Sequence, residues 1–290
     1  MNIRVSKQID FKNEDIKNHN QIFPKVSENL VQLPFIALLI GSSGQGKTTT
    51  CLNFIKRYVD ENAFDRIALW SPTSVPDERT NISADPRFLQ LPLTNMYADY
   101  ADDDLVDLIE LQKDEIKEYK DYLDDMKLWN KYCKNPTPEL EDQCLEMYER
   151  TGNCPPHSHL KRFPSGLIIM DDLTDSLQKT GRNCRLNGFV CRIRHNLFSW
   201  IGNFQSLSQC PPTIRKQCNL YFIFKSSSQK ALESIYQEVC SGDMDFKTFL
   251  KMFSMLENRH DFILINLKAK DPKRKYRINF DKYLEFDKFI

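Results

Sequence analysis

The sequence lacks several features that mark well-defined classes of protein. It has no run of about 18 or more apolar residues, so we expect no membrane span. Its polar, mixed-charge start, MNIRVSKQIDFKNEDIK, contains no apolar signal core. Forty basic residues balance forty acidic ones, so any contact with nucleic acid must come from local patches or from an oligomeric ring. Internal repeats and low-complexity tracts are also absent.

A disulfide framework is missing as well. The nine cysteines show no spacing typical of one, which favours reduced thiols inside a cell. The segment CPPHSH supplies Cys154, His157 and His159 as possible zinc ligands, with Cys133 and Cys144 nearby. Structural zinc sites favour short paired cysteine spacings, and only half of such a site is present. We therefore interpret this segment as a polar turn.

Apolar runs alternate with helical patterns along the 290 residues, of which 41% are hydrophobic. Outside the insertion, helices are predicted over 47–60, directly after the strand at 166–172, and over 229–239. The predicted strands are PFIALLI (34–40), RIALW (66–70), GLIIMDD (166–172), NLFSWIGNF (196–204), NLYFIF (219–224), DFILINL (261–267) and KYRINF (275–280). This alternation indicates an α/β fold of the P-loop type, a mainly parallel sheet flanked by helices.

The chain divides into an arm and one domain. Residues 1–33 are polar and are predicted to form an N-terminal arm or edge element, and residues 34–290 form the P-loop domain. A helical insertion is predicted at about 96–163, because 101–129 and 138–150 show helical spacing of apolar residues. Its dense charge is typical of a solvated helix face.

A glycine-rich loop carries the clearest motif. Residues 41–48, GSSGQGKT, fit the pattern GxxxxGK[ST] directly after one strand and before one helix. Gly41, Gly44 and Gly46 allow the backbone N–H groups to face a polyphosphate, and the helix adds its positive end. Lys47 can reach the β and γ phosphates, and Thr48 can place its hydroxyl on Mg²⁺. The predicted ATP-binding set is completed by Ser42, Ser43, Gln45 and Thr49.

Two carboxylates end the strand at 166–172. We expect this strand beside the phosphate-binding strand, with its tip near the γ-phosphate. Asp171 would hold Mg²⁺ through water, and Asp172 would orient or deprotonate the attacking water. Alternatively, Asp172 caps a helix over 173–179 at its amino end.

Three further polar residues follow the carboxylates in the chain. Gln205 ends the strand at 196–204, where it could sense phosphate or position water. Arg194 precedes the same strand, at the sheet's opposite end from the chain's own nucleotide, so it could serve a neighbouring subunit as an arginine finger. Arg215 is a second candidate for that role or for sensing. Each of the two arginines could instead form a surface salt bridge.

Two basic segments are candidates for DNA contact. Residues 182–195, RNCRLNGFVCRIRH, and residues 268–277, KAKDPKRKYR, could touch DNA phosphates inside a ring. Solvated surface is the alternative for both segments.

Four segments together resemble the FtsK–HerA superfamily: Walker A at 41–48, LIIMDD at 167–172, RHNLFSWIGNFQS at 194–206 and PPTIRKQCNLYFIF at 211–224. They look most like its viral branch, the poxvirus-type genome-packaging ATPases of giant viruses, virophages and related double-stranded DNA elements. WSPT at 70–73, the double aspartate and the arginine–histidine pair before a strand ending in Gln-Ser support that branch. The similarity covers roughly residues 30–240.

The resemblance implies a RecA-like (ASCE) P-loop ATPase that assembles as a ring, usually hexameric, and drives double-stranded DNA into a preformed capsid. Its implied cofactors are ATP and Mg²⁺, and its implied partners are double-stranded DNA, other copies of the chain and a capsid or portal-vertex protein. The implied location is intracellular in the host, in the cytoplasm or at the virus assembly site, with association with the virion as an option.

The resemblance also implies roles for individual residues. Lys47 and Thr48 match the Walker A pair, and Asp171 and Asp172 match the Walker B pair. Gln205 matches the polar residue of the sensor strand, and Arg194 matches the arginine finger. The chain departs from the family pattern in its long insertion and in the length of the segment before Arg194, which leaves Arg182, Arg185 and Arg192 as rivals for the finger.

Two other functions stay open. A HerA-like translocase in DNA processing or transfer would share these motifs. A nucleotide-binding assembly switch without steady turnover would not need Asp172. A GTPase is disfavoured because no guanine-reading Asn-Lys-x-Asp string occurs, and an ABC transporter is disfavoured because the signature segment is missing.

Overall fold

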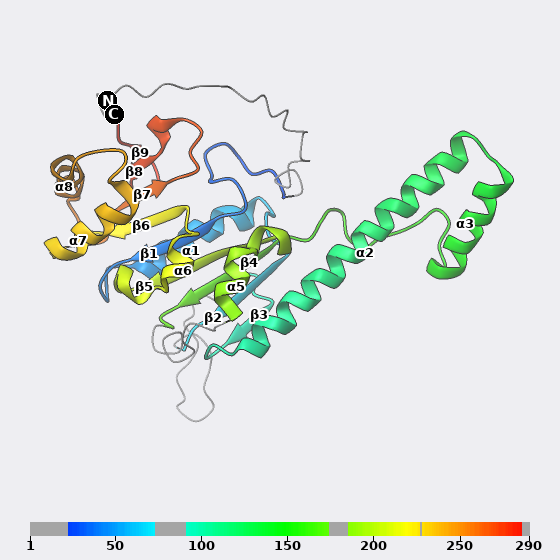
Figure 1. Ribbon diagram of the computed structural model, residues 1–290, viewed down its shortest axis with the longest axis horizontal. Helices are drawn as coiled ribbons and strands as arrows, with labels where there is room; N and C mark the ends of the chain where they lie inside the picture. The colour runs from blue at the N-terminus through cyan, green and yellow to red at the C-terminus, as the bar shows by residue number, and fades with distance from the viewer. Residues whose placement is uncertain (1–22, 73–90, 174–184, 227, 286–290) are drawn as a thin grey trace, which may run out of the picture.

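The protein is an α/β molecule built on one mainly parallel sheet (Figure 1). The computed structural model describes residues 23–72, 91–173, 185–226 and 228–285. Within these residues nine strands follow the order β3-β2-β4-β5-β1-β6-β7-β8-β9. The first six of this order pair in parallel, and β7, β8 and β9 continue the sheet antiparallel. The predicted α/β fold with a mainly parallel sheet is confirmed.

The strands lie close to the predicted segments. They are β1 (Ile36–Ile40), β2 (Arg66–Trp70), β3 (Asn95–Tyr97), β4 (Gly166–Asp171), β5 (Phe198–Phe204), β6 (Leu220–Phe224), β7 (Phe262–Asn266), β8 (Tyr276–Ile278) and β9 (Lys282–Tyr283). The helices are α1 (Lys47–Asp60), α2 (Asp102–Lys134), α3 (Pro138–Thr151), α5 (Arg185–Cys191), α6 (Pro212–Arg215), α7 (Gln229–Ile235) and α8 (Phe246–Ser254).

Strand β5 lies between the phosphate-loop strand β1 and the aspartate strand β4. In register, Leu38 pairs with Gly202 of β5, and Gly202 pairs with Met170 of β4. The expectation that the aspartate strand lies directly beside β1 is therefore wrong. All three strands run in the same direction, so their carboxyl ends still meet at one edge of the sheet, which we call the carboxyl edge.

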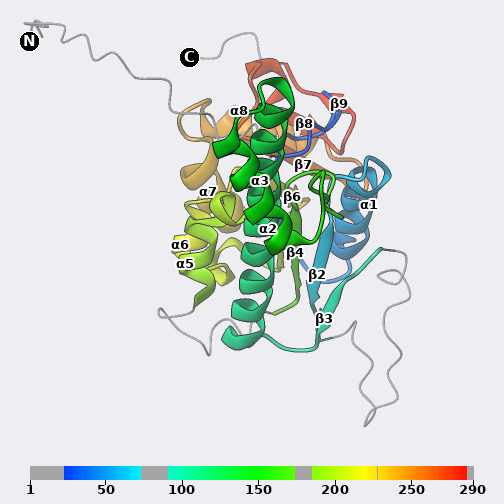
Figure 2. The same ribbon diagram turned by 90° about the vertical axis from the view of Figure 1, so that its right-hand side faces the viewer.

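Helices cover both faces of the sheet, as Figure 2 shows with α1 on one side and α5, α6 and α7 on the other. Alternate side chains of β1 point to opposite faces. Ala37 and Leu39 pack in a core with α1, whereas Leu38 and Ile40 pack in a second core with α2 and α5 to α8. Every residue of β1, β2, β4, β5, β6 and β7 is buried, which explains their nearly continuous apolar sequences.

Residues 23–33, the described part of the predicted N-terminal arm, pack against the domain. Phe23, Val31 and Leu33 are buried in the core around α1. The Tyr58 hydroxyl of α1 donates a hydrogen bond to the Val31 carbonyl at 2.9 Å. This part of the predicted arm is therefore a covering layer on one face of the sheet. The rest of the arm lies outside the described residues.

Helices α2 and α3 form a hairpin that projects beyond the sheet (Figure 1). The 33 residues of α2 span about 50 Å, and only its first half packs on the sheet, through Leu105 and Leu108. Buried Arg66 of β2 anchors the helix by donating to Gln112 at 2.8 Å and to Glu115 at 2.7 Å. Both predicted helices of this region are present.

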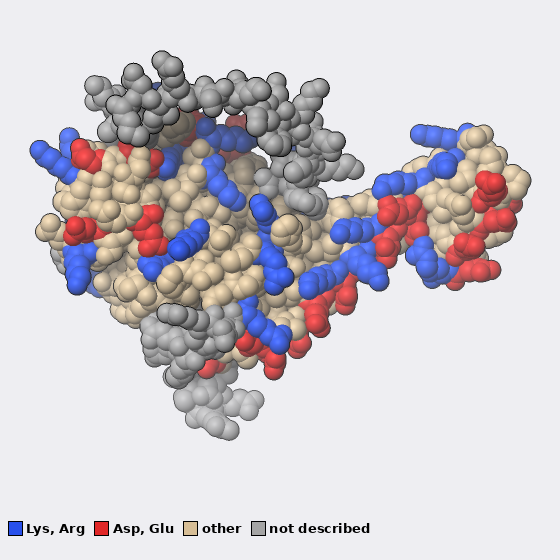
Figure 3. Space-filling view, in the orientation of Figure 1, with Lys and Arg blue, Asp and Glu red and all other residues tan. Residues whose placement is uncertain are grey.

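The projecting part of the hairpin is polar. Arg150 of α3 donates to Asp125 of α2 at 2.5 Å and ties the two helices together. Figure 3 shows acidic and basic side chains together along this part, as expected for a solvated surface. Among the helices of the described ranges, none has both the length and the apolar character of a membrane span.

Several elements differ from the prediction, among them the four-residue helix α6, which was not predicted. The short strands β3 and β9 and helix α8 were not predicted, since two or three residues of strand leave almost no periodicity to detect. Helix α8 has a clear local start, because the Asp245 side chain accepts a hydrogen bond from the Thr248 amide. Helix α7 ends at Ile235, where a π-helical turn begins, so it is shorter than the predicted 229–239.

The tight packing around Gly202 of β5 gives a test of the fold. A Cβ at this position would lie 2.2 Å from the Trp200 ring and 2.7 Å from the Phe204 ring, and both rings are buried. We expect Gly202→Ala to lower the free energy of unfolding by about 1–3 kcal/mol through overpacking. The matched control is Gly242→Ala, which would meet no atom within 4 Å. Equal midpoints of denaturant unfolding for the two variants would contradict this packing.

Candidate functional site

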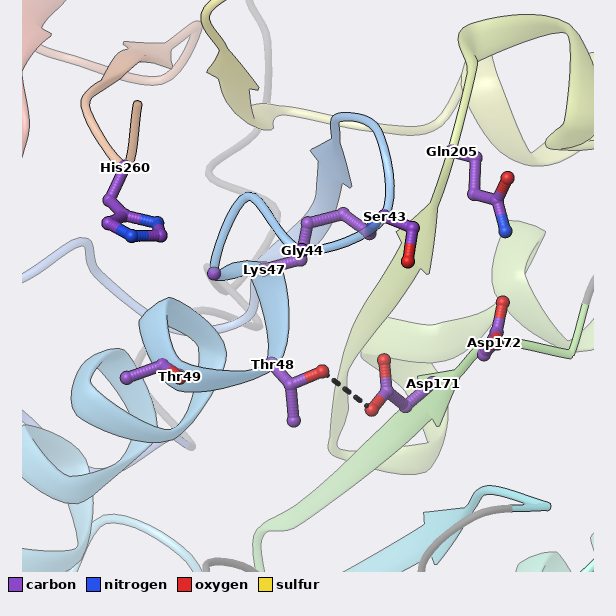
Figure 4. A pocket seen from close by; sticks show the side chains of 10 residues that line it. Ser43, Gly44, Lys47, Thr48, Thr49, Asp171, Asp172, Gln205 and His260 are labelled. Atoms are coloured by element: carbon purple, nitrogen blue, oxygen red, sulfur yellow. Dashed lines mark hydrogen bonds between the residues drawn. The ribbon is translucent and has the colours of Figure 1, made fainter. Parts of the chain in front are cut away.

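A pocket of about 360 Å³ opens at the carboxyl edge of the sheet. It lies where the loop after β1 leads into α1 and where β4 and β5 end (Figure 4). Its volume is in the usual range for small-molecule and cofactor sites. The pocket is lined by Ser43, Gly44, Gly46, Lys47, Thr48, Thr49, Asp171, Asp172, Gln205 and His260. All but His260 belong to the residues predicted from the sequence.

The glycines of the loop have conformations or neighbours that exclude side chains. Gly44 and Gly46 have φ angles of 73° and 89°, in the left-handed region that favours glycine. A Cβ on Gly41 would lie 2.7 Å from the Phe224 Cβ. The Gln45 side chain closes the loop, because its Oε1 accepts from the Ser42 amide at 2.7 Å. These contacts hold the curled backbone that a polyphosphate requires.

Lys47 begins α1 and faces the phosphate position. Its Nζ donates to the Gly41 carbonyl at 2.7 Å and to the Ser42 carbonyl at 3.1 Å, across the mouth of the loop. Burial lowers the pKa of Lys47, and the nearby carboxylates of Asp171 and Asp172 oppose this shift. The first turn of α1 contains no acidic residue, so its positive end is available to an anion.

The carboxylate of Asp171 joins three elements of the fold. Thr48 Oγ1 of α1 donates to Asp171 Oδ2 at 3.0 Å, and Asn203 Nδ2 of β5 donates to Asp171 Oδ1 at 2.7 Å (Figure 4). Asp171 is only 5% exposed. Burial raises the pKa of Asp171, and the hydrogen bonds from Asn203 and Thr48 oppose this shift. Both carboxylate oxygens are thus held at fixed positions beside the loop.

This pair of oxygen donors fits Mg²⁺. The ion is usually bound through one or two carboxylates together with phosphate oxygens and water, and it needs no cage of protein ligands. The Thr48 hydroxyl and the Asp171 carboxylate already converge to 3.0 Å at the entrance of the phosphate loop. Thr48 and Asp171 would hold the ion, and its charge would offset the negative charge of the phosphates.

Asp172 and Gln205 lie at one end of the pocket, with their side chains pointing toward one another (Figure 4). Asp172 has a φ of 56°, an uncommon left-handed conformation for a residue with a side chain. This turn directs its carboxylate into the pocket after the buried strand ends. Such outliers cluster at active sites, where their strain of about 1–3 kcal/mol is tolerated for function. The helix that Asp172 might alternatively cap lies outside the described residues.

The two candidate arginines lie away from this pocket. Arg194 is exposed in the turn before β5, at the opposite edge of the sheet from the phosphate loop, as predicted. Arg215 donates to Glu238 at 2.8 Å, so it forms a salt bridge in this subunit. Of the rival arginines, Arg185 and Arg192 are exposed, and Arg182 lies outside the described residues.

Sequence analysis missed two residues of the site. Asn203 fixes Asp171, and the signal for it was a polar residue two positions before Gln205 in an apolar strand. His260 reaches the pocket because β7 runs antiparallel to β6 and therefore starts at the carboxyl edge. The direction of β7 cannot be read from its apolar pattern, so nothing in the sequence placed His260 beside the phosphate loop.

Across the described ranges, no three His, Cys, Asp or Glu side chains are grouped so as to hold a metal ion. His159 pairs with Glu118 of α2 at 3.2 Å, and His157 is exposed. The segment that contains these residues is polar and runs back along the hairpin.

Among the comparisons with known proteins, only the comparison with solved structures found similar proteins. No protein-family model matches the chain, and no curated protein matches it. Among solved structures, it is similar to the genome packaging NTPase B204 from Sulfolobus turreted icosahedral virus 2, solved with ATP-γS. The two are 11% identical with a TM-score of 0.42, over 85% of this chain and 96% of B204.

Two other similar structures come from bacterial ATPases and a conjugation protein. ATPases 2 and 3 of EssC from Geobacillus thermodenitrificans are 14% identical, with a TM-score of 0.42, over 86% of this chain and 38% of theirs. The pCW3 conjugation coupling protein TcpA is 12% identical, with a TM-score of 0.47, over 89% of this chain and 62% of its own. The fold assignment rests on the strand order above, and the functional assignment rests on the site.

The Asn203–Asp171 hydrogen bond gives a test of the site. We expect Asn203→Ala to weaken the binding of ATP by about 10-fold when Mg²⁺ is present, because residues that orient a metal ligand typically contribute 10–100-fold to metal affinity. Binding measured by calorimetry in excess EDTA should stay unchanged. Asn219→Ala is the matched control, since Asn219 is a buried asparagine that accepts from the Ile36 amide at the far edge of the sheet. Loss of affinity in EDTA as well would contradict the assigned role.

Proposed function

We propose that this protein is an ATP-hydrolysing motor that translocates double-stranded DNA and packages a viral genome into a preformed capsid. One observation carries the proposal: Lys47, the adjacent pair Asp171 and Asp172, and Gln205 come from three separate places in the chain and line one pocket. These residues also carry the sequence resemblance to genome-packaging ATPases.

The geometry supports hydrolysis by positioning and electrostatics, as phosphoryl transfer requires. The loop amides and Lys47 would bind the β and γ phosphates, and Thr48 with Asp171 would hold Mg²⁺. Asp172 and Gln205 face each other at the end of the pocket where the γ-phosphate would lie (Figure 4). Asp172 would accept a proton from the attacking water, and Gln205 would orient that water.

Exposed basic residues would supply the contacts with DNA phosphates. Arg185 and Arg192 are exposed in the first basic segment, and Lys270, Lys273 and Arg274 are exposed in the second. The three other cations of the second segment are engaged within the fold. Lys268 donates to the Pro34 carbonyl at 3.1 Å, Lys275 pairs with Asp243, and Arg277 is buried against Tyr283. We assign DNA contact to the exposed residues and a structural role to Lys268, Lys275 and Arg277.

Two alternatives use the same pocket. A HerA-like translocase in DNA processing or transfer would share every residue of the site and differ in its partners. An assembly switch without turnover would bind ATP without needing Asp172, and the left-handed turn that directs Asp172 into the pocket favours hydrolysis. Packaging is preferred over the first alternative because the sequence string from Arg194 to Phe224 looks most like the viral branch.

ATPase rates with and without double-stranded DNA test the proposal. We expect DNA to stimulate turnover of the wild-type chain, and Lys47→Ala to abolish nucleotide binding. Asp172→Asn should keep ATP affinity but lower turnover by about 10²–10⁴-fold, the usual contribution of a positioned general base. Wild-type binding without any turnover would favour the assembly switch. Equal turnover in Asp172→Asn would remove the role assigned to Asp172.

Mixed rings test whether Arg194 acts on a neighbouring subunit. Arg194 is exposed at the edge opposite its own nucleotide pocket, so a ring could bring it to the pocket of the next copy. We expect mixtures of Arg194→Ala and Lys47→Ala subunits to recover part of the ATPase rate that each variant lacks alone. Lys131→Ala, at an exposed basic residue of the hairpin, is the matched control in place of Arg194→Ala. Stable mixed rings without recovery would contradict action across the interface.

A further inference from the structure

We propose that His260 forms the nucleoside side of the ATP site, with its imidazole accepting a hydrogen bond from the ribose or the base. This inference rests on the proposed nucleotide site and assigns a binding subsite within it. His260 lines the pocket but belongs to the loop before β7, far in sequence from the Walker A and Walker B segments.

The positions of the pocket residues fix which end holds the nucleoside. In Figure 4, Asp172 and Gln205 lie at one end, Lys47 lies between, and His260 lies at the other end above Thr49. If Asp172 and Gln205 attend the γ-phosphate, the triphosphate runs along the loop, and the ribose and base extend toward His260. The exposed face of α1 continues from Thr49 to Asn53, one turn further on.

The loop that carries His260 is held in place before any ligand binds. Asp261 Oδ2 accepts from the Glu257 amide at 3.1 Å and from the Asn258 amide at 2.8 Å. Asp261 Oδ1 accepts from Asn279 Nδ2 at 3.0 Å, which ties the loop to the end of β8. Lys225 Nζ donates to the Leu256 carbonyl at 2.7 Å. A loop fixed at both ends presents its exposed side chains in a defined position.

Arg259 and His260 also contact the outer side of the phosphate loop. His260 Nδ1 lies 3.1 Å from the Gln45 carbonyl oxygen, and Arg259 Nη2 lies 3.4 Å from the Ser43 carbonyl oxygen. Added Cβ atoms would lie 2.9 Å from Arg259 at Gly44 and 3.2 Å from His260 at Gly46. Both glycines also have positive φ angles, so a side chain at either position would be strained and would crowd this loop. These contacts occupy the carbonyls of Ser43 and Gln45 and hold the loop in its curled conformation.

The chemistry of the imidazole favours a nucleoside over a phosphate as its ligand. A carbonyl oxygen only accepts hydrogen bonds, so the contact with Gln45 requires the proton on Nδ1. In the neutral imidazole Nε2 is then an acceptor. Ribose hydroxyls and the adenine amino group are donors, whereas the ionised phosphate oxygens are acceptors. His260 therefore matches the nucleoside part of ATP.

Binding of ATP, ADP and inorganic tripolyphosphate to the full chain separates these possibilities. At pH 8, with Mg²⁺ present, we expect His260→Ala to weaken ATP and ADP by about 10-fold, the loss of one hydrogen bond of about 1.4 kcal/mol. Tripolyphosphate affinity should stay within about 2-fold of wild type, because its binding does not use a nucleoside contact. His260→Gln, which keeps an acceptor oxygen, should recover part of the ATP affinity. His157→Ala, at an exposed histidine of the insertion, is the matched control.

Each contrary result has a distinct meaning. A wild-type chain that binds no ATP would overturn both the proposed function and this inference. A wild-type chain that binds ATP, with equal affinity in His260→Ala, would overturn only the inference. Equal losses for ATP and tripolyphosphate would also overturn it, because they would show that His260 merely holds the phosphate loop.

Discussion

The buried carboxylate of Asp171 is the constraint on which the site depends. It accepts hydrogen bonds from Thr48 at the start of α1 and from Asn203 at the end of β5, and it is itself the last residue of β4. This one carboxylate therefore joins α1, β4 and β5, which are far apart in the sequence. Hydrogen bonds to a charged acceptor stabilise by about 1.5–3 kcal/mol each, and a buried carboxylate without them would be costly. Parallel strands with aligned carboxyl ends make this convergence possible.

The pocket combines two parts of the fold. The parallel strands β1, β4 and β5 supply the phosphate loop and the residues that we assign to hydrolysis. The antiparallel extension from β7 supplies the loop with Arg259 and His260, which contacts the phosphate loop from outside. Gln45 links the two parts, because its amide donates to the Lys225 carbonyl at 2.5 Å while Lys225 anchors the loop before β7. A movement of the antiparallel strands would therefore displace the phosphate loop directly.

The hairpin α2–α3 is attached to the same sheet but contributes no residue to the pocket. Arg66 fixes its first half at the start of β2, opposite the pocket, and its second half projects into solvent (Figure 1). The start of α2 lies at the carboxyl edge, where the Asp102 carboxylate accepts from the Arg185 amide at 3.1 Å. The first half of α2 is thus anchored to the core at both edges of the sheet, and the projecting half of the hairpin has a polar surface.

Sequence patterns predicted most of the core and the phosphate site, and the reasons for the misses are physical. Buried strands such as Ile36–Ile40 and the GxxxxGK[ST] loop carry strong local signals, so Lys47, Thr48 and the aspartates were placed correctly in one pocket. Local patterns do not specify strand neighbours, so β5 was not expected between β1 and β4. An apolar run does not reveal the direction of its strand either, so the position of His260 beside the phosphate loop could not be predicted. Short edge strands such as β3 are stabilised by pairing rather than by their own sequence.

The most direct test is an experimental structure of the chain with Mg²⁺ and a non-hydrolysable ATP analogue. We expect the β and γ phosphates within hydrogen-bond distance of the loop amides and Lys47 Nζ. The metal ion should be held by the Thr48 hydroxyl and the Asp171 carboxylate, directly or through one water. A nucleotide bound elsewhere, or a metal ion without contact to either residue, would contradict the central claim.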